Sequence, residues 1–142
     1  MALRNGSRFA VSMTDVFPYG CCLVPDSIVE AQDYDEKTGR RTPSIDRVTG
    51  KRVFQCRVSD LDPELAGRSR ETVVKILADQ QPQPPTRQPF ERVEFDGLVV
   101  TPYVDSGRCQ GRGRCGARMA FSLRATGLKS ARPVAQPGKD AA

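Results

Sequence analysis

The chain has 142 residues, with 22 Lys and Arg against 17 Asp and Glu, and it has no histidine or tryptophan. The length predicts one domain, and the missing histidine removes the commonest general base near neutral pH and the commonest metal ligand. Residues 1–103 carry 14 basic and 15 acidic side chains, whereas residues 104–142 carry 8 and 2. This uneven net charge of +5 indicates either contact with a nucleic acid or anionic surface, or a solubilising basic tail.

The N-terminal third predicts a flexible start followed by extended chain and turns. Residues 1–14 have no continuous apolar stretch, so we expect a flexible N-terminus and no secretion signal. Residues 19–34 predict extended chain that Pro25 interrupts, either as an edge strand or as a strand with a bulge. "DEKTGR" (35–40) and "DRVTGK" (46–51) share Asp-x-x-Thr-Gly-basic, which predicts two successive turns at the tip of a long hairpin.

Two segments, 51–60 and 117–126, alternate apolar and polar residues with the period of a half-buried strand. The side chains expected to face the core are Phe54, Cys56 and Val58 in the first segment and Met119, Phe121, Leu123 and Ala125 in the second. The side chains expected to face outward are Val53, Gln55, Arg57 and Ser59, and Arg118, Ala120, Ser122, Arg124 and Thr126.

The segments between these two strands predict more extended structure. "RETVVKILAD" (70–79) fits a helix or a strand, and its adjacent valines favour the strand. Residues 79–90 hold four prolines, which predict an extended connector and exclude a helix; docking of these prolines in an aromatic groove is the less favoured alternative. Residues 91–105 are rich in β-branched and aromatic residues, with a tight turn or bulge at Asp96-Gly97.

These elements predict one mainly β domain over residues 15–129. Five strands joined by turns favour a small five-stranded barrel, and we expect an OB-like one. The proline connector stands where an OB fold usually carries a helix, which is a departure from that pattern. Residues 130–142 have little to bury and are expected to form a disordered basic tail.

The five cysteines do not indicate a metal or redox site. No two of them have the two-residue spacing of a zinc half-site, and no histidine can complete one. No apolar run approaches the ~20 residues that span a bilayer, so we expect a cytoplasmic protein whose thiols stay reduced. No serine or cysteine has a plausible base nearby in the sequence. We therefore expect no cofactor, no metal and no enzymatic activity.

"SGRCQGRGRCGA" (106–117) joins the fourth and fifth expected strands and is the strongest candidate for contact with phosphate. Its arginines and the next one alternate with glycines: they are Arg108, Arg112, Arg114 and Arg118. Glycine keeps such a loop mobile and arginine offers bidentate donors to phosphate. A permissive insertion at a hairpin tip explains the same loop, because extra residues there cost little free energy. Both interpretations stay open.

Other outward side chains extend this candidate surface. The basic ones are Arg57, Lys75 and Arg124. Aromatic side chains on which a base can stack are few, and the weak candidates are Tyr19, Tyr34 and Tyr103. Tyrosines more often lie at the rim of a core, and we expect Phe54, Phe95 and Phe121 to be buried.

Several blocks of the chain together resemble a known family. They are "VFPYG" (16–20), "DYDEKTGRRTPSIDRVTGKRVFQCRV" (33–58), "VVKILADQQPQPP" (73–85), "FDGLVVTPYVD" (95–105) and "RMAFSLRATGLK" (118–129). The family is that of the plasmid replication, integration and excision activators, encoded on integrative conjugative elements of actinomycete bacteria. The resemblance implies a regulator without catalytic activity. Its members usually have a short turn between positions 105 and 118, which favours the permissive interpretation of the loop.

Three hypotheses follow, with different partners. The first is a DNA-associated regulator of a mobile element, acting through the basic loop and tail. The second is an adaptor that binds a plasmid-encoded protein, such as a replication or transcription factor, through the proline connector or an open sheet edge. The third is an OB-fold protein that binds single-stranded DNA, against which the sparse aromatic residues argue.

Overall fold

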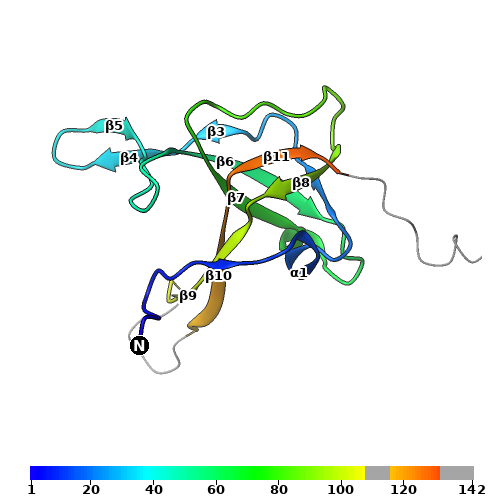
Figure 1. The fold of residues 1–142 in the computed structure, drawn as a ribbon, viewed down its shortest axis with the longest axis horizontal. Helices are drawn as coiled ribbons and strands as arrows, with labels where there is room; N and C mark the ends of the chain where they lie inside the picture. Colours follow the sequence, from blue (N-terminus) through cyan, green and yellow to red (C-terminus); the bar gives the residue numbers. More distant parts are fainter. Residues whose placement is uncertain (108–115, 132–142) are drawn as a thin grey trace, which may run out of the picture.

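The computed structural model describes residues 1–107 and 116–131, and these residues form a mainly β fold (Figure 1). The strands are β1 (Phe9–Ala10), β2 (Cys21–Leu23), β3 (Val29–Glu30), β4 (Gln32–Asp35), β5 (Arg40–Pro43), β6 (Arg52–Asp60), β7 (Glu71–Ala78), β8 (Arg92–Asp96), β9 (Val99–Asp105), β10 (Arg118–Ala125) and β11 (Gly127–Ser130). The helices are α1 (Met13–Val16) and a 3-10 turn (Gly67–Arg70). Within the described residues no helix is long and apolar enough to cross a membrane.

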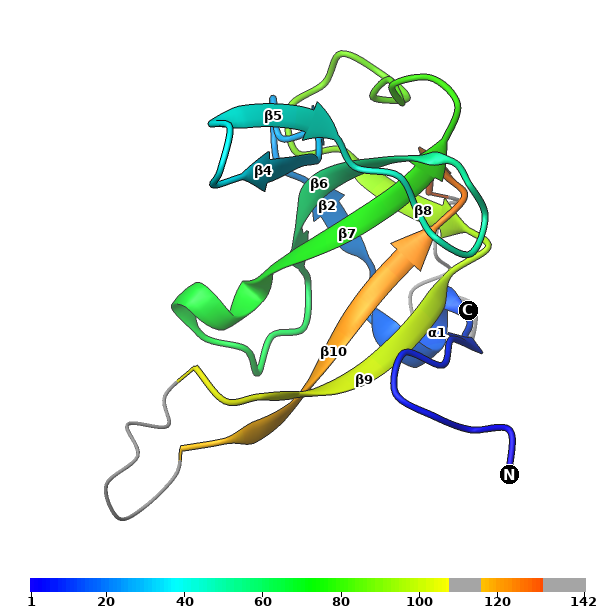
Figure 2. The same cartoon turned by 90° about the vertical axis from the view of Figure 1, so that its left-hand side faces the viewer.

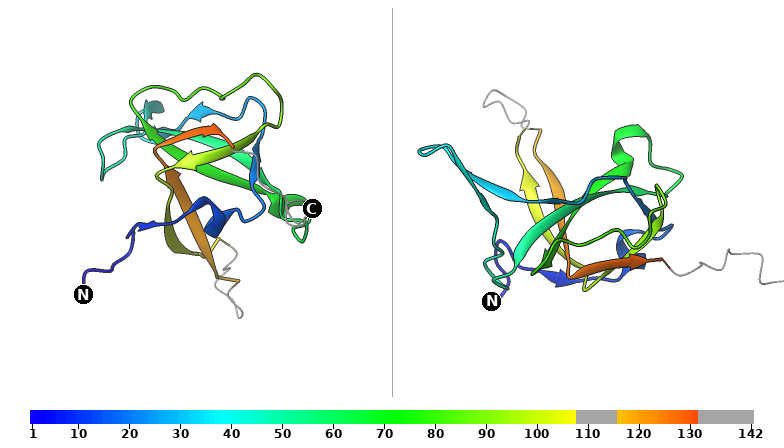
Figure 3. Two further views of the ribbon diagram at one scale, coloured as in Figure 1. Left: turned by 45° about the vertical axis from the view of Figure 1, so that its right-hand side comes forward. Right: turned by 90° about the horizontal axis from the view of Figure 1, so that it is seen from above.

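In this part of the chain the main sheet has nine strands, and β4 and β5 form a separate hairpin. The strand order is β1-β9-β10-β7-β6-β2-β8-β11, with β3 also paired to β6. The sheet curls into a half-barrel, while the hairpin projects away from it (Figure 3). The mainly β class is confirmed. The sheet has nine strands where we expected five, and it does not have the form of a five-stranded closed barrel.

The curl arises from one long, bent, two-stranded ribbon. β8 and β9 together pair with β11 and β10 in a single register, from Asp105 opposite Arg118 to Asp96 opposite Gly127. The ribbon bends at Gly97, whose φ is 61°, and there Thr126 N donates to Asp96 O at 2.8 Å. The Asp96-Gly97 break is therefore a bend in a continuous ribbon and not the turn of a hairpin. Leu123–Ala125 of β10, on one side of the bend, also pair with β7, and β8, on the other side, also pairs with β2.

The core lies on the inner face of the curled sheet, and β6 and β7 supply its centre. Phe54, Cys56 and Val58 are fully buried, which confirms the inner face predicted for β6. Val53 was expected to face outward but is also buried. The segment before β6 runs alongside it here, since Val53 N donates to Ser44 O at 3.0 Å.

β10 departs from its predicted pattern along its first half. Leu123 and Ala125 are buried as expected, whereas Met119 and Phe121 are 61% and 63% exposed. The cause is the length of the contact with β7, which extends only from Leu123 to Ala125 on β10. The first half of β10 runs with β9 past the start of β7 (Figure 2). The apolar face of the ribbon therefore continues beyond the core.

The two repeated motifs form two turns of similar geometry. Gly39 N donates to Asp35 O and Gly50 N donates to Asp46 O, both at 2.8 Å. Both glycines have positive φ, as the prediction required. The first turn closes the β4–β5 hairpin, and the second leads into β6. The predicted turns are confirmed, although they lie at separate places and not at one hairpin tip.

The other segments meet the sheet at its margins. The strand predicted at 70–79 is confirmed as β7, and residues 79–90 connect β7 to β8 without a helix. Residues 19–34 are extended chain that Pro25 interrupts, as expected, because β2 and β3 both pair with β6 on either side of it. β2 also pairs with β8, so it is not an edge strand.

Both ends of the domain differ in extent from the sequence-based boundaries. Part of the segment 1–14, expected to be flexible, takes part in the fold: Phe9–Ala10 pair with β9, and Ser12 caps α1. At the other end β11 extends to Ser130, and Ala131 N donates to Arg92 O. The disordered tail predicted for 130–142 lies outside the described residues from residue 132 onward.

Candidate nucleic-acid interface

Five of the candidate residues share the outer face of the main sheet. Residues paired in a strand ladder point to the same side, and side chains alternate along each strand. Arg57 is paired with Val73, Lys75 with Arg124, and Tyr103 with Ala120. On β6, β7 and the second half of β10 these positions alternate with buried residues, among them Cys56, Val74 and Leu123. We call this surface the basic face, and its members are Arg57, Lys75, Tyr103, Arg118 and Arg124.

A groove crosses the basic face where β7 and β10 separate. The two strands are paired in parallel over three residues each and diverge toward their N-terminal ends (Figure 2). Side chains of β7, β9 and β10 line the space between them, and six of these are Val73, Lys75, Thr101, Tyr103, Ser122 and Arg124. We call it the β7–β10 groove. It brings together three candidates that the sequence had placed on three separate strands.

Lys75 and Arg124 place two positive charges side by side in this groove. Their Cα atoms are partners in the parallel ladder, and neither side chain forms an ion pair with a carboxylate among the described residues. Arg124 Nη1 donates to Thr101 Oγ1 at 3.3 Å. Burial lowers the pKa of Arg124, and the nearby Arg8 acts in the same direction. Like charges on neighbouring strands repel, so an anion bound between them would be favourable.

The basic face includes one arginine that is already paired. Arg57 Nη1 donates to Glu71 Oε1 at 3.0 Å, and both side chains are about half exposed. Such an exposed pair contributes little free energy and exchanges readily with another anion. Arg118 lies opposite Asp105 in the ladder, and Asp105 Oδ1 accepts from Gly107 N. Arg57 thus has an ion pair and Arg118 an acidic ladder partner, whereas Lys75 and Arg124 have neither among the described residues. The carboxylate of Asp46 acts on Arg124 only from a longer distance, by raising its pKa against the effect of burial.

An ion pair that the sequence did not reveal supports one side of this region. Arg8 donates from both terminal nitrogens to the carboxylate of Asp46, with Nη1 to Oδ2 at 3.0 Å, and the Asp46 side chain is only 5% exposed. The guanidinium of Arg8 holds the pKa of Asp46 well below its usual range, and Thr49 contributes through its own hydrogen bonds. Arg8 lies in a segment expected to be flexible, so no local pattern indicated this contact.

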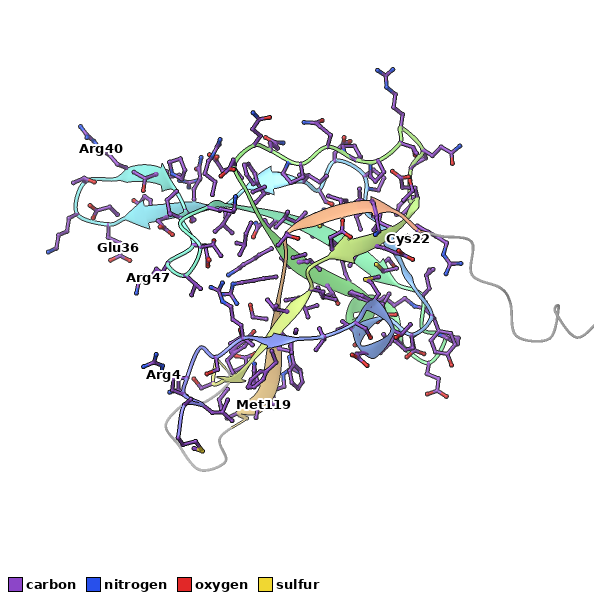
Figure 4. The ribbon with its side chains drawn as sticks, viewed as in Figure 1. Arg4, Cys22, Glu36, Arg40, Arg47 and Met119 are labelled. Carbon is purple, nitrogen blue, oxygen red and sulfur yellow. The ribbon has the colours of Figure 1, made fainter. Side chains whose placement is uncertain are left out.

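The three candidate tyrosines do not gather into one stacking surface. Tyr103 is 49% exposed and lines the groove. Tyr34 lies on the β4–β5 hairpin with Arg41 5.8 Å from its ring centroid, and Tyr19 lies before β2, where its carbonyl accepts from Arg92. Figure 4 places Glu36 and Arg40 on that projecting hairpin, and Met119 lies apart from them on β10.

Phe121 is an aromatic side chain that sequence reasoning wrongly placed in the core. It is exposed and lines the β7–β10 groove. In the ladder Phe121 is paired with Pro102, so it points to the side of the ribbon opposite to Tyr103. The groove is therefore lined by side chains from both faces of the ribbon. Alternation alone gave no signal that this part of β10 extends past the core.

Two of the described cysteines, Cys21 and Cys56, are buried and unreactive. Cys21, Cys22 and Cys56 are free, and burial raises the pKa of Cys21 and Cys56 to about 12. Within the described part of the chain no three His, Cys, Asp or Glu side chains are placed to hold a metal ion. The candidates Arg108, Arg112 and Arg114, together with Cys109 and Cys115, lie outside the described residues.

Comparisons with known proteins do not assign this interface. No family model, no curated protein and no solved structure matches the chain. The family that the sequence blocks resemble is therefore an expectation from the sequence. The chemistry of the interface has to be argued from its own residues. These are two cations in register that form no ion pair within residues 1–107 and 116–131, hydroxyl groups beside them, and an exposed ring.

Proposed function

We propose that this chain is a non-enzymatic, DNA-associated regulatory protein of an integrative plasmid, where it activates replication, excision and integration functions. The regulatory role rests on the family resemblance of the sequence blocks. The DNA contact rests on the β7–β10 groove. One observation carries it: Lys75 and Arg124 lie next to each other on paired strands, with no carboxylate in ion-pair contact in the described chain.

The chemistry of the groove suits a phosphate backbone. Arginine offers two parallel donors to a phosphate and lysine adds a point charge. Ser122 and Thr101, opposite each other on β10 and β9, place hydroxyl groups beside them. The OB-like interpretation of the half-barrel belongs to this proposal as well, because in OB folds the loop between the fourth and fifth strands contacts the ligand. In this chain the corresponding loop joins β9 to β10.

Fluorescence anisotropy with labelled DNA over a series of salt concentrations tests this proposal. We expect the double variant Lys75→Gln/Arg124→Gln to bind more weakly, with the slope of log K against log salt reduced by about 1.4 to 1.8, since each phosphate contact contributes about 0.7 to 0.9. The control variant Lys37→Gln/Arg40→Gln removes the same charge from the projecting hairpin and should bind normally. Equal binding by the two variants, or no binding by the wild type at low salt, would contradict the proposal.

A second candidate function, that of an adaptor for a replication or transcription factor, is favoured by the apolar face of the ribbon. Val104 and Met119 are paired across β9 and β10 and are 63% and 61% exposed, next to Pro102 and Phe121. Adjacent exposed apolar side chains of this kind often contact another protein. The variant Val104→Gln/Met119→Gln should abolish binding to a purified plasmid-encoded partner and leave DNA binding unchanged. Unchanged partner binding would rule out this surface.

A further inference from the structure

The β7–β10 groove combines its charges with apolar and aromatic walls. Val73 is exposed on β7 beside Lys75, and Tyr103 and Phe121, which lie on opposite faces of the ribbon, both line the groove. The phosphates of a duplex lie on its outside and its bases are stacked inside. The base faces of a duplex are therefore not available to stack on exposed aromatic rings. A single strand presents both phosphates and unstacked base faces.

The spacing along β10 sets the distance between the charged and aromatic parts of the groove. Tyr103 is paired with Ala120, which is four residues from Arg124 on the same strand. At roughly 3.3 Å per residue this separation is about 13 Å. That is about four nucleotide steps at the stacked spacing of roughly 3.4 Å, and fewer for an extended strand. It agrees with the lower end, about four nucleotides, of the site sizes of small β-barrels that bind single strands.

We propose that the ligand of the β7–β10 groove is single-stranded DNA and not a duplex. Phosphates contact Lys75 and Arg124, and a base a few nucleotides along the strand stacks on Tyr103. This inference rests on the proposed DNA association and specifies its ligand.

The described part of the chain lacks the element with which most proteins enter a duplex groove. Its α-helix, Met13–Val16, has four residues and sits at the margin of the sheet. A two-stranded ribbon can also enter the major groove. The β9–β10 ribbon, however, presents the apolar side chains of Met119, Phe121 and Val104 on one face. These side chains cannot donate to or accept from base edges, so this face of the ribbon is a poor reader of a duplex. The donors of the ribbon, Tyr103, Arg118 and Arg124, lie on its other face.

Anisotropy titrations of the full chain with a labelled oligothymidine of about 12 nucleotides and with a DNA hairpin of the same charge distinguish the two ligands. We expect tighter binding of the single strand. Tyr103→Leu should weaken binding of the single strand roughly 5- to 100-fold, because stacking on one base contributes at about this level. Tyr103→Phe, which retains the ring, should bind normally, and so should the control Tyr34→Leu on the separate hairpin.

Tyrosine fluorescence provides an independent readout of stacking. The chain has three tyrosines and no tryptophan, so the variant Tyr19→Phe/Tyr34→Phe has Tyr103 as its one fluorophore of this kind. The tyrosine emission of this variant should be quenched when the oligothymidine binds and should change little when the DNA hairpin binds. A purely structural role of Tyr103 would not produce this difference.

The outcomes separate this inference from the proposed function. The single-strand inference would be overturned if the DNA hairpin bound equally well or more tightly, if Tyr103→Leu left binding unchanged, and if the tyrosine emission were not quenched. The proposed DNA association would still stand. Binding of neither DNA at low salt would overturn the proposed function, and the inference with it. Preferential binding of the single strand that depends on the ring of Tyr103 supports both.

Discussion

The ion pair between Arg8 and Asp46 joins the N-terminal segment to the turn that precedes β6. The carboxylate of Asp46 is nearly inaccessible and receives hydrogen bonds from Arg8 and Thr49. Its pKa in the folded protein is lowered, chiefly by the hydrogen bond from Arg8. A carboxyl group whose folded-state pKa is below the unfolded value of about 3.9 contributes stability above that value and loses it as the pH falls.

We therefore expect the wild-type protein to lose stability as the pH falls below about 5, through protonation of Asp46 among other groups. Asp46→Asn should lower the melting temperature at pH 7, because the charged hydrogen bonds to Arg8 are weakened. The expected loss in the free energy of unfolding is about 1–3 kcal/mol. The difference between wild type and variant should shrink toward pH 2. Thermal melts followed by circular dichroism over this pH range measure it, and a constant difference would contradict the assignment.

The cysteines allow a second test at the scale of single side chains. Burial raises the pKa of Cys21 and Cys56 to about 12, so at pH 8 only about one thiol in 10⁴ at these positions is ionised. In the variant Cys109→Ser/Cys115→Ser, a thiol reagent such as DTNB should react with Cys22 in the folded protein and with Cys21 and Cys56 only after denaturation. Rapid reaction of three thiols in the folded protein would contradict this burial.

At the scale of single residues, predictions from the sequence succeeded where a residue contacts others that are only a few positions away in the chain. The Asp and Gly residues of the two repeated motifs form the expected turns, since side-chain capping and positive φ are local properties. They failed where the partner is distant in the chain. Arg8 and Asp46 are 38 residues apart, and no spacing rule relates them.

At the scale of elements, the bent ribbon of β8–β9 and β10–β11 is the part of the fold on which the groove depends. The alternation of β10 correctly grouped Met119, Phe121, Leu123 and Ala125 on one face. It could not indicate where β10 leaves the sheet, because the length of contact with β7 is a tertiary property. The sequence identified Tyr103 and Arg124 as candidates from their outward positions. It assigned Phe121 to the core because the length of the contact with β7 was unknown.

Gly97 at the bend of the ribbon tests its construction. A Cβ atom at this position would lie 2.7 Å from Thr126 Oγ1, and the φ of 61° is itself unfavourable for alanine. Gly97→Ala should therefore destabilise the protein by about 2–4 kcal/mol, through both backbone strain and the clash. Chemical denaturation followed by circular dichroism measures the loss.

Two further variants separate the two causes. Gly39 has a similar φ of 67° with no atom within 4 Å of a built Cβ, so Gly39→Ala should cost about 1–2 kcal/mol from strain alone. The double variant Gly97→Ala/Thr126→Ala should recover the part that comes from the clash. Equal effects of Gly97→Ala and Gly39→Ala would show that the contact with Thr126 is unimportant.

At the scale of the whole molecule, the class of fold followed from the sequence but its topology did not. Period-two patterns and turns are local signals that predict a mainly β domain. The parallel pairing of β7 with β10 joins segments separated by the proline connector and the whole of β8 and β9. This pairing brings Lys75 beside Arg124, so the most informative feature of the candidate interface was outside the reach of sequence patterns.

The uneven charge of the molecule leads to the last prediction, which concerns the loop between β9 and β10. Two interpretations of Arg108, Arg112 and Arg114 stay open, as phosphate contacts or as parts of a permissive insertion, and they differ in one measurable quantity. We expect the triple variant to glutamine to lower the salt slope of single-stranded DNA binding by about 2, since each of three contacts contributes about 0.7. The Lys75→Gln/Arg124→Gln change should add to this reduction, because the groove and the loop would contact different phosphates. An unchanged slope would assign DNA binding to the groove alone and leave the loop as a permissive insertion.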